Sequence, residues 1–398
     1  MLLHSIQLKN FLSYGPNSQS LALQDLNVII GANGSGKSNL LEAIALLKST
    51  PQELVRPIRL GGSVRDWIWK DGSNKGIPNA SVEVIVDNGR TQHIHQSLRY
   101  RFDFTESGKR FDIVDEILEY EEAVQGNSRP LFFYKYEHGY PILNVKVEGK
   151  EEWTKRTLRK ETIDPEKSIL AQRYDPDTYL EISYLADAFK EIKIYRDWAF
   201  GPFSSIRQPQ KTDAIGKHLS EDMSNIAIIL SKLKKSSAAR SKFLEYFRTA
   251  YEGLDDYDID ISAGSAEIYV REGNITIPAT RLSDGTLRLL CLLAVLCDPE
   301  PPRLICIDEP ELGLHPDLIN MMADALHYAA KRTQIIVTTH SVGLVSAFTK
   351  TPEAVVVCEK EDGCTQMRRL IPEELEAWLE DYDLGQLWTR GHIGGTRW

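Results

Sequence analysis

The sequence predicts an α/β fold: a mixed central sheet with an antiparallel β insertion and a short helical insertion. Two observations lead to this prediction. At both ends of the chain, short apolar runs typical of buried strands alternate with stretches of helical periodicity. From about residue 79 to 150, short alternating runs separated by DNG, SGK, QGN and EHG indicate an antiparallel meander of hairpins.

The chain is divided by these changes of pattern. We expect a first lobe at 1–175 that contains the β insertion, a helical insertion at 176–255, a second lobe at 256–350 and a C-terminal tail at 351–398. About 110 residues separate Gln172 from Ser283, and they show no sustained heptads. A long coiled coil is therefore not expected.

The individual elements follow from the same periodicities. Strands are expected at residues 5–14, 26–30, 267–279, 303–311 and 333–341. Helices are expected after the glycine turn at 31–36 and at residues 179–192, 220–233, 282–296 and 316–332.

The composition is that of a globular protein without a membrane segment. Of 398 residues, 42% are hydrophobic and 26% are charged, and no run approaches the roughly 18 apolar residues that cross a bilayer. The N-terminus lacks the apolar core and cleavage site of a secretory signal. Five scattered cysteines show neither disulfide density nor metal-ligand spacing. We therefore expect a cytoplasmic protein with reduced thiols.

The net charge of −10 argues against a protein that coats nucleic acid, because phosphate neutralisation needs clustered Lys and Arg. Two local basic stretches, at 155–160 and 232–242, could still contact DNA. Such runs are more often solvated helix faces. DNA is therefore an open alternative among the partners and not the first expectation.

A phosphate loop, residues 31–38, follows the strand at 26–30 and opens a helix. Its sequence GANGSGKS fits G-x-x-x-x-G-K-[ST] at every fixed position. Glycines let the backbone N–H groups of Gly34, Ser35 and Gly36 surround a phosphate, while Lys37 reaches the β and γ oxygens and Ser38 ligates Mg²⁺.

Two acidic residues and a histidine follow buried strands in the second half of the chain. Asp308 ends the run LICID and is the expected second Mg²⁺ ligand, and Glu309 is the candidate general base for the attacking water. His340 follows the next strand and could donate to the γ-phosphate. Strands that alternate with helices in this way are expected to be neighbours in a parallel sheet.

The order of these motifs resembles the ABC-type ATPase head, a P-loop NTPase, that RecF, SMC and OLD (overcoming lysogenisation defect) proteins share. The compact OLD-like AAA ATPases are the most similar group. The resemblance covers nearly the whole chain, and its most specific pieces are LSDGTLRLL, DEPELGLHP and the DLGQLW segment of the tail. It implies ATP and Mg²⁺ as ligands.

The resemblance identifies residues 282–286, LSDGT, as the signature loop, which contacts the γ-phosphate held by a second copy. Two copies would then enclose two ATP molecules as a homodimer, with a higher oligomer left open. The loop residues assigned to this contact are Ser283, Asp284 and Gly285. The LSDGT sequence differs from the Leu-Ser-Gly-Gly-Gln of transporter ATPases.

The same resemblance assigns four further residues. Gln172 would be the Q-loop glutamine, which lies near Mg²⁺ and the attacking water. Asn33 and Asn39 would flank the phosphate loop, and His315 would lie at the dimer seam.

Fewer than 60 residues follow His340, too few for the Toprim nuclease domain of OLD proteins, so no nuclease site is expected in this chain. We expect an ATPase that switches a separately encoded effector, a nuclease or toxin, as the sensor or scaffold of an anti-phage system. The alternatives are a RecF-like DNA-binding ATPase of DNA repair and a slow structural subunit. An aromatic stripe in the tail, around Trp378 and Trp388, would either dock a partner or fold back on the chain.

Overall fold

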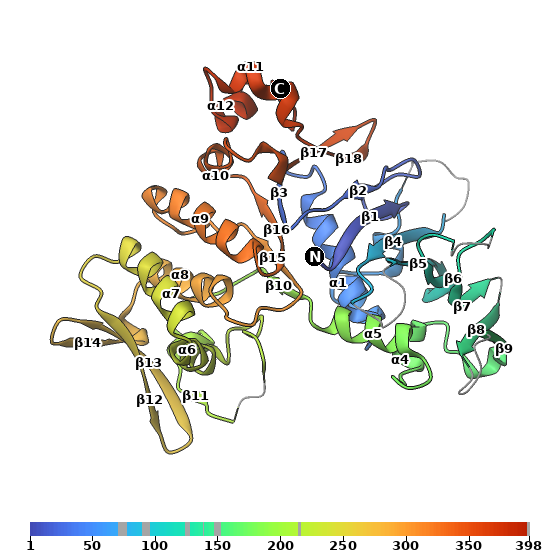
Figure 1. Ribbon diagram of the computed structural model, residues 1–398, viewed down its shortest axis with the longest axis horizontal. Helices are drawn as coiled ribbons and strands as arrows, with labels where there is room; N and C mark the ends of the chain where they lie inside the picture. The colour runs from blue at the N-terminus through green and yellow to red at the C-terminus, as the bar shows by residue number, and fades with distance from the viewer. Residues whose placement is uncertain are drawn as a thin grey trace.

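The computed structural model describes residues 1–70, 78–89, 96–123, 128–137, 139–146, 153–213 and 216–395. Two sheets dominate the fold (Figure 1), and the predicted mixed α/β architecture is confirmed. The central sheet is parallel except for its last strand, in the order β10 (Lys193–Tyr195), β15 (Leu304–Asp308), β16 (Gln334–Thr339), β3 (Leu26–Ile30), β17 (Val355–Glu361) and β18 (Cys364–Arg369).

The predicted antiparallel insertion is a continuous sheet that also takes in the N-terminal strands. Because β4 pairs with β1, the hairpins extend the sheet that begins at the N-terminus. Its order is β2 (Leu21–Ala22), β1 (Leu3–Lys9), β4 (Ala80–Val86), β5 (Leu98–Ser107), β6 (Arg110–Tyr120), β7 (Phe132–Glu137), β8 (Tyr140–Lys146) and β9 (Trp153–Thr157).

Helices cover both faces of the central sheet. They are α1 (Lys37–Ser49), α2 (Val55–Leu60), α3 (Val64–Trp67), α4 (Ile169–Gln172), α5 (Leu180–Lys190), α6 (Ile226–Lys235), α7 (Ser237–Ala250), α8 (Asp284–Leu296), α9 (Ile319–Ala330), α10 (Val342–Ala347), α11 (Pro372–Leu379) and α12 (Leu384–Thr389). Short 3₁₀ helices lie at Lys160–Thr162, Ser205–Arg207, Ala279–Arg281, Pro316–Leu318 and Pro352–Ala354.

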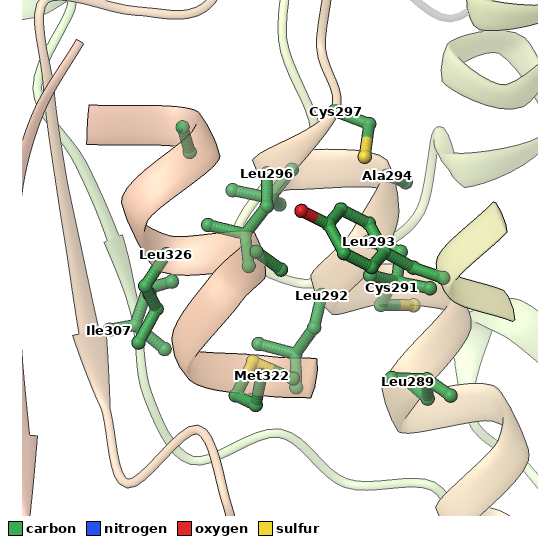
Figure 2. Close-up of a cluster of buried hydrophobic side chains, with 14 of the residues drawn as sticks. Leu289, Cys291, Leu292, Leu293, Ala294, Leu296, Cys297, Ile307, Met322 and Leu326 are labelled. Atoms are coloured by element: carbon green, nitrogen blue, oxygen red, sulfur yellow. The ribbon is translucent and has the colours of Figure 1, made fainter. Parts of the chain in front are cut away.

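Alternate side chains of each central strand enter two separate hydrophobic cores. In β3, Ile29 faces the core that contains α1, α5 and the antiparallel sheet. Its neighbours Val28 and Ile30 face the core that contains α6 to α9. Figure 2 shows part of that second core, where leucines of α8 pack against Met322 of α9 and Ile307 of β15. The helices α1 and α8 therefore lie on opposite faces of the sheet.

A smaller antiparallel sheet extends from the α6–α8 side of the molecule (Figure 1). It consists of β11 (Gln210–Lys211), β13 (Ser265–Glu272), β12 (Asp256–Ser262) and β14 (Ile275–Pro278). Within the described residues, no helix is long and apolar enough to span a bilayer.

Two parts of the central sheet lie where the sequence predicted other structure. The strand β10 lies inside the segment 176–255 that was expected to be helical, and β17 and β18 lie inside the predicted tail. The strand β10 is only three residues long, and β17 has only four apolar residues, Val355–Cys358, so a pattern cannot distinguish either from buried helix or loop. The end of the tail folds back on the chain: α12 packs on α10 and buries Trp388, whereas the side chain of Trp378 stays 45% exposed.

Candidate functional site

The sheet register brings three of the predicted motifs to one edge. Asp308 of β15 pairs with Thr338 of β16, and Thr338 pairs with Ile29 of β3. The phosphate loop, Glu309 and His340 each begin one or two residues later. All three motifs therefore leave the sheet at the carboxyl ends of adjacent parallel strands, where α/β sheets bind ligands.

The phosphate loop needs glycine where the backbone is left-handed and enclosed. Gly36 has φ +113°, and a side chain there would overlap the Oγ1 of Thr365. Gly34, with φ +76°, faces open space, since a Cβ would meet no atom within 4 Å. The loop is thus packed on one side and open on the other, as a cradle for a phosphate requires.

Residues outside the motif support the packed side of the loop. The hydroxyl of Thr365 of β18, which is fully buried, donates to the carbonyl of Ser35 at 2.7 Å and lies 2.6 Å from Oγ of Ser13. Asn39 donates to the same Oγ at 2.6 Å, and the hydroxyl of Tyr14 donates to the carbonyl of Gly36 at 3.1 Å. Sequence reasoning missed Ser13 and Thr365, because they lie more than 300 residues apart and neither belongs to a motif.

Lys37 is buried and lies across the phosphate loop. Its Nζ donates to the carbonyls of Gly31 at 2.8 Å and Ala32 at 3.1 Å. Burial lowers the pKa of Lys37, and the charges of Glu309 and Asp308 oppose that shift. The charges of both carboxylates therefore favour the ammonium form of Lys37.

Asp308 and Ser38 each offer a side-chain oxygen of the kind that binds Mg²⁺. The hydroxyl of Thr338 donates to Oδ1 of Asp308, which fixes the carboxylate at the end of β15. Ser38, at the start of α1, is exposed. Hard oxygen ligands in small number, completed by water and phosphate, are typical of Mg²⁺ sites. No group of three or more metal-binding side chains occurs among the residues that the structure describes, so any ion here would depend on such additional ligands.

Glu309 has an unusual backbone that three hydrogen bonds maintain. Its φ is +47°, a left-handed conformation that costs energy for a residue with a side chain. Its N–H donates to the carbonyl of Thr338 at 3.0 Å, and its carbonyl accepts from Nη2 of Arg288 at 2.9 Å and from the N–H of Leu312 at 3.1 Å. Oε1 of Glu309 lies 3.4 Å from Nε2 of His340, and both side chains are about one-third exposed. The structure thus brings these two predicted residues together at an accessible position.

The electrostatics of His340 favour a neutral ring. Partial burial lowers its pKa, and Lys37 acts in the same direction, whereas Glu309 and Asp308 raise it. A neutral imidazole has one donor and one acceptor nitrogen. Near neutral pH, His340 can therefore accept from one group and donate to another at the edge of the sheet.

The signature loop lies on α8, on the other face of the central sheet from α1. Ser283 caps the helix, with its Oγ accepting from the N–H of Thr286 at 3.1 Å. Asp284, whose side chain is 67% exposed, pairs with Nη2 of Arg207 at 2.5 Å. Among the described residues, no hydrogen bond or ion pair joins this loop to the phosphate loop. The two anion-binding motifs of one chain therefore do not form one site.

The three remaining residues assigned by the resemblance lie at different positions relative to the cluster at the sheet edge. Gln172 does not join the cluster: its side chain bonds the backbone of Asp164 at 2.8 and 3.1 Å and of Lys167 at 2.7 Å. Asn33 is exposed beside the phosphate loop. His315 is 71% exposed and caps the 3₁₀ helix 316–318.

His315 also lines a groove of about 490 Å³ that begins at the signature loop. The groove is bordered by Ser283, Gly285 and Thr286 on one side and by residues 313–318 on the other. The signature loop and the loop after the acids therefore share one exposed surface.

Known proteins resemble this chain over different lengths. The family model described as "AAA domain, putative AbiEii toxin, Type IV TA system" matches residues 26–346. The Old nuclease of Escherichia phage P2 is 40% identical over 74 residues, 18% of this chain and 12% of that protein. Structural maintenance of chromosomes protein 2 of Homo sapiens is 32% identical over 127 residues, 32% of this chain and 9% of that protein. The matches thus span a small part of these relatives.

Solved structures resemble the fold over nearly the whole chain. The SMC head bound to the C-terminal winged-helix domain of ScpA has a TM-score of 0.57 at 16% identity, covering 94% of this chain and 99% of the other. Together with the family match, this likeness identifies the fold as an ABC-type ATPase head of the OLD/SMC-like group.

Proposed function

Because this chain belongs to that AAA-domain family, we propose that it binds ATP and Mg²⁺ and hydrolyses ATP between two copies of itself. The observation that carries this proposal is the register of β15, β16 and β3, which brings Lys37, Asp308, Glu309 and His340 to one edge. The signature loop on the far face supplies a second phosphate-binding surface that a partner's site can use.

In the proposed reaction, the phosphate loop and Lys37 bind the β- and γ-phosphates, with Asn33 and Asn39 beside them. Glu309 accepts a proton from water as its oxygen attacks the γ-phosphorus, and the bond to the bridging oxygen breaks to give ADP and phosphate. His340 holds Glu309 and the water in place. Mg²⁺, when held by Ser38 and Asp308, supplies positive charge that stabilises the leaving diphosphate.

The signature loop of one copy would contact the γ-phosphate bound in the site of the other copy, through Ser283, Asp284 and Gly285. A helix N-terminus is suited to that contact, because its free N–H groups face an anion. Gln172 has no step in this mechanism, because its side-chain oxygen and both of its N–H donors bond the backbone within the turn at 164–172. A role near Mg²⁺ would require α4 to release those bonds.

Substitution of Glu309 tests the assignment of the base. We expect Glu309→Gln to keep the ATP dissociation constant and to lower turnover by roughly 10²- to 10⁴-fold, the usual contribution of a general base. Turnover is measured as phosphate release, and affinity by calorimetry at a temperature where the variant does not turn over. A Glu309→Gln protein with near wild-type turnover would show that another group deprotonates the water.

The output of the ATPase is proposed to be a switch in a separately encoded effector, a nuclease or toxin of an anti-phage system. The family description names a toxin, one relative is a nuclease, and SMC heads have been solved with ScpA bound. These likenesses support an ATPase head that acts through another protein. Co-expression with the product of the adjacent gene tests it: ATP should change their co-purification in Glu309→Gln, and equal recovery with and without ATP would contradict the switch.

A RecF-like DNA-binding ATPase is the second candidate. One observation favours it: Lys155 and Arg156 are exposed on β9, at the edge of the antiparallel sheet. In the other basic stretch, at 232–242, four of the five basic residues form ion pairs: Lys232–Asp298, Lys234–Asp258, Arg240–Asp256 and Lys242–Glu245. DNA binding through β9 predicts a salt-dependent affinity that Lys155→Gln with Arg156→Gln removes.

A further inference from the structure

Arg288 connects the two halves of the proposed reaction within one chain. It lies on α8, five residues after Ser283, and its Nη2 donates to the carbonyl of Glu309 at 2.9 Å. The helix that carries the signature loop is thereby bonded to the backbone of the proposed general base. Arg288 lies within the LSDGTLRLL segment, but the sequence does not show that its partner is the carbonyl of Glu309.

The guanidinium of Arg288 has hydrogen-bonding capacity in reserve. It is half-buried, 6.0 Å from the ring centroid of Trp198, and its Nε is buried without a hydrogen-bond partner. Oε2 of Glu311 is also buried without one, although Thr339 donates to Oε1. Glu311 is the largest electrostatic influence that opposes the lowering of the Arg288 pKa by burial. Arg288 therefore has an unused buried donor, and Glu311 has an unused buried acceptor.

A second contact ties the signature loop to the segment after the acids. A Cβ on Gly285 would lie 2.9 Å from the carbonyl oxygen of Gly313, so the two backbones touch. The body of α8 is packed by apolar side chains against α9 and β15 (Figure 2). A displacement of the N-terminus of α8 would therefore be transmitted to residues 309–313 through both Arg288 and Gly285.

The backbone conformation of Glu309 would respond to such a displacement. Its left-handed backbone persists only because its surroundings hold it. Of its three backbone hydrogen bonds, the one from Arg288 is the only one that comes from a side chain. We propose that Arg288 is a positioning residue: when the signature loop engages the nucleotide of the partner copy, Arg288 sets the carboxylate of Glu309 in its own copy. Hydrolysis in one site then depends on occupancy of the other. This inference rests on the function proposed above.

The test compares Arg288→Met with Arg303→Met. Methionine keeps the apolar stem against Trp198 but removes the donors. Arg303 is the matched control, because it also stacks on an aromatic ring, that of Tyr184 at 4.9 Å, on a surface without site residues. We expect Arg288→Met to keep ATP affinity within about twofold and to lower kcat about tenfold, the effect of one hydrogen bond to a charged group. Its Hill coefficient for ATP should fall toward 1, while Arg303→Met resembles the wild type.

Arg288→Lys separates the hydrogen bond from packing. Lysine can donate to the same carbonyl, so it should recover most of the kcat that Arg288→Met loses. If both variants fold and lose kcat equally, or if Arg288→Met keeps wild-type kcat and Hill coefficient, the inference is wrong. If Arg288→Met melts well below the control, Arg288→Gln replaces it in the same comparison. A wild-type protein without ATP hydrolysis would instead overturn the proposed function, so the two failures are distinguishable.

Discussion

The phosphate loop and the signature loop are both helix N-termini suited to phosphate, yet their surroundings differ. Ser35, Gly36 and Lys37 are buried, and the loop is closed from outside by Thr365 and the segment around Ser13. At the signature loop, Ser283 and Asp284 are exposed. The phosphate loop is therefore covered on one side by residues of its own chain, whereas the signature loop is exposed to solvent.

That difference teaches how the two loops can serve one reaction. A phosphate held at Lys37 would have an open side at Gly34, where no atom of the described residues lies within 4 Å of an added Cβ. The signature loop of the same chain cannot cover that open side, because α1 and α8 lie on opposite faces of the sheet. In the proposed dimer, the signature loop of the second copy covers it. The following predictions test three regions. We call the phosphate loop the closed end, the core around Glu116 the interior, and the signature loop the open end.

The largest effect is expected at the closed end. Lys37→Ala removes two charge-assisted hydrogen bonds to phosphate, at roughly 2 kcal/mol each, so ATP affinity should fall about 10³-fold and turnover should be lost. Calorimetric titration with ATP measures the affinity. Lys48→Ala, on the last turn of the same helix, serves as control. Retained micromolar binding by Lys37→Ala would show that the loop does not bind the phosphates.

Glu116, in the interior, should make stability depend on pH. It is fully buried and accepts from Ser168 at 2.6 Å, Tyr100 at 2.8 Å and the N–H of Ile169 at 3.0 Å, but burial still raises its pKa to about 7. The folded protein therefore binds this proton more tightly than the unfolded chain. The stability from Glu116 is present below about pH 4.5 and is lost as the pH rises through about 7, by up to about 3 kcal/mol.

Glu116→Gln should remove that dependence. Urea unfolding at pH 5 and pH 8 measures it: the difference between the two free energies of unfolding should shrink in the variant. An unchanged difference would show that Glu116 titrates normally. ATP affinity at a fixed pH should change little, because Glu116 touches neither loop.

A third test asks how tightly the closed end is packed. Gly36→Ala places a methyl against Thr365 and keeps a left-handed backbone, which together should cost about 2 kcal/mol of unfolding free energy. Gly264→Ala is the control, because Gly264 has φ +80° but no atom within 4 Å of an added Cβ. The difference between the two variants isolates the steric part. Equal losses would mean that the phosphate loop has room to relax.

The smallest effect is expected at the open end. Asp284 places a negative charge where a partner's phosphate would bind, and Arg207, only 10% exposed, neutralises it. Arg207→Gln should weaken ATP-driven association about tenfold, and Asp284→Asn in the same chain should restore most of it. Arg281→Gln, an exposed neighbour, controls for charge. If Asp284→Asn fails to rescue, Arg207 acts through its bonds to the carbonyls of Ala279 and Thr280 instead.

The sequence predicted the elements that local pattern determines. The phosphate loop, the strand ends at Asp308 and Thr339, and the helix at LSDGT were all correctly placed, because each combines a fixed spacing with an apolar run. The antiparallel meander was also correct. The roles of the individual site residues stay predictions.

What pattern could not predict depends on contacts between distant segments. Thr365 supports the phosphate loop from β18, inside what was expected to be a tail, and no local signal marks it. The hydrogen bonds of Gln172 within its own turn, and the ion pairs that neutralise Lys234 and Arg240, likewise require the folded chain. Arg288 lies in the LSDGTLRLL segment, but the sequence does not indicate its contact, because its partner is a carbonyl 21 residues away.

The solution mass of Glu309→Gln, measured by light scattering with and without Mg-ATP, tests the central claim most directly. The account predicts a monomer of 45.1 kDa without nucleotide and twice that mass with it. Adding Ser283→Arg to the same chain, which obstructs the signature loop, should leave a monomer that still binds ATP. A mass that stays at dimer or larger whatever the nucleotide, or an ATP-bound monomer, would contradict closure of the site by a second copy.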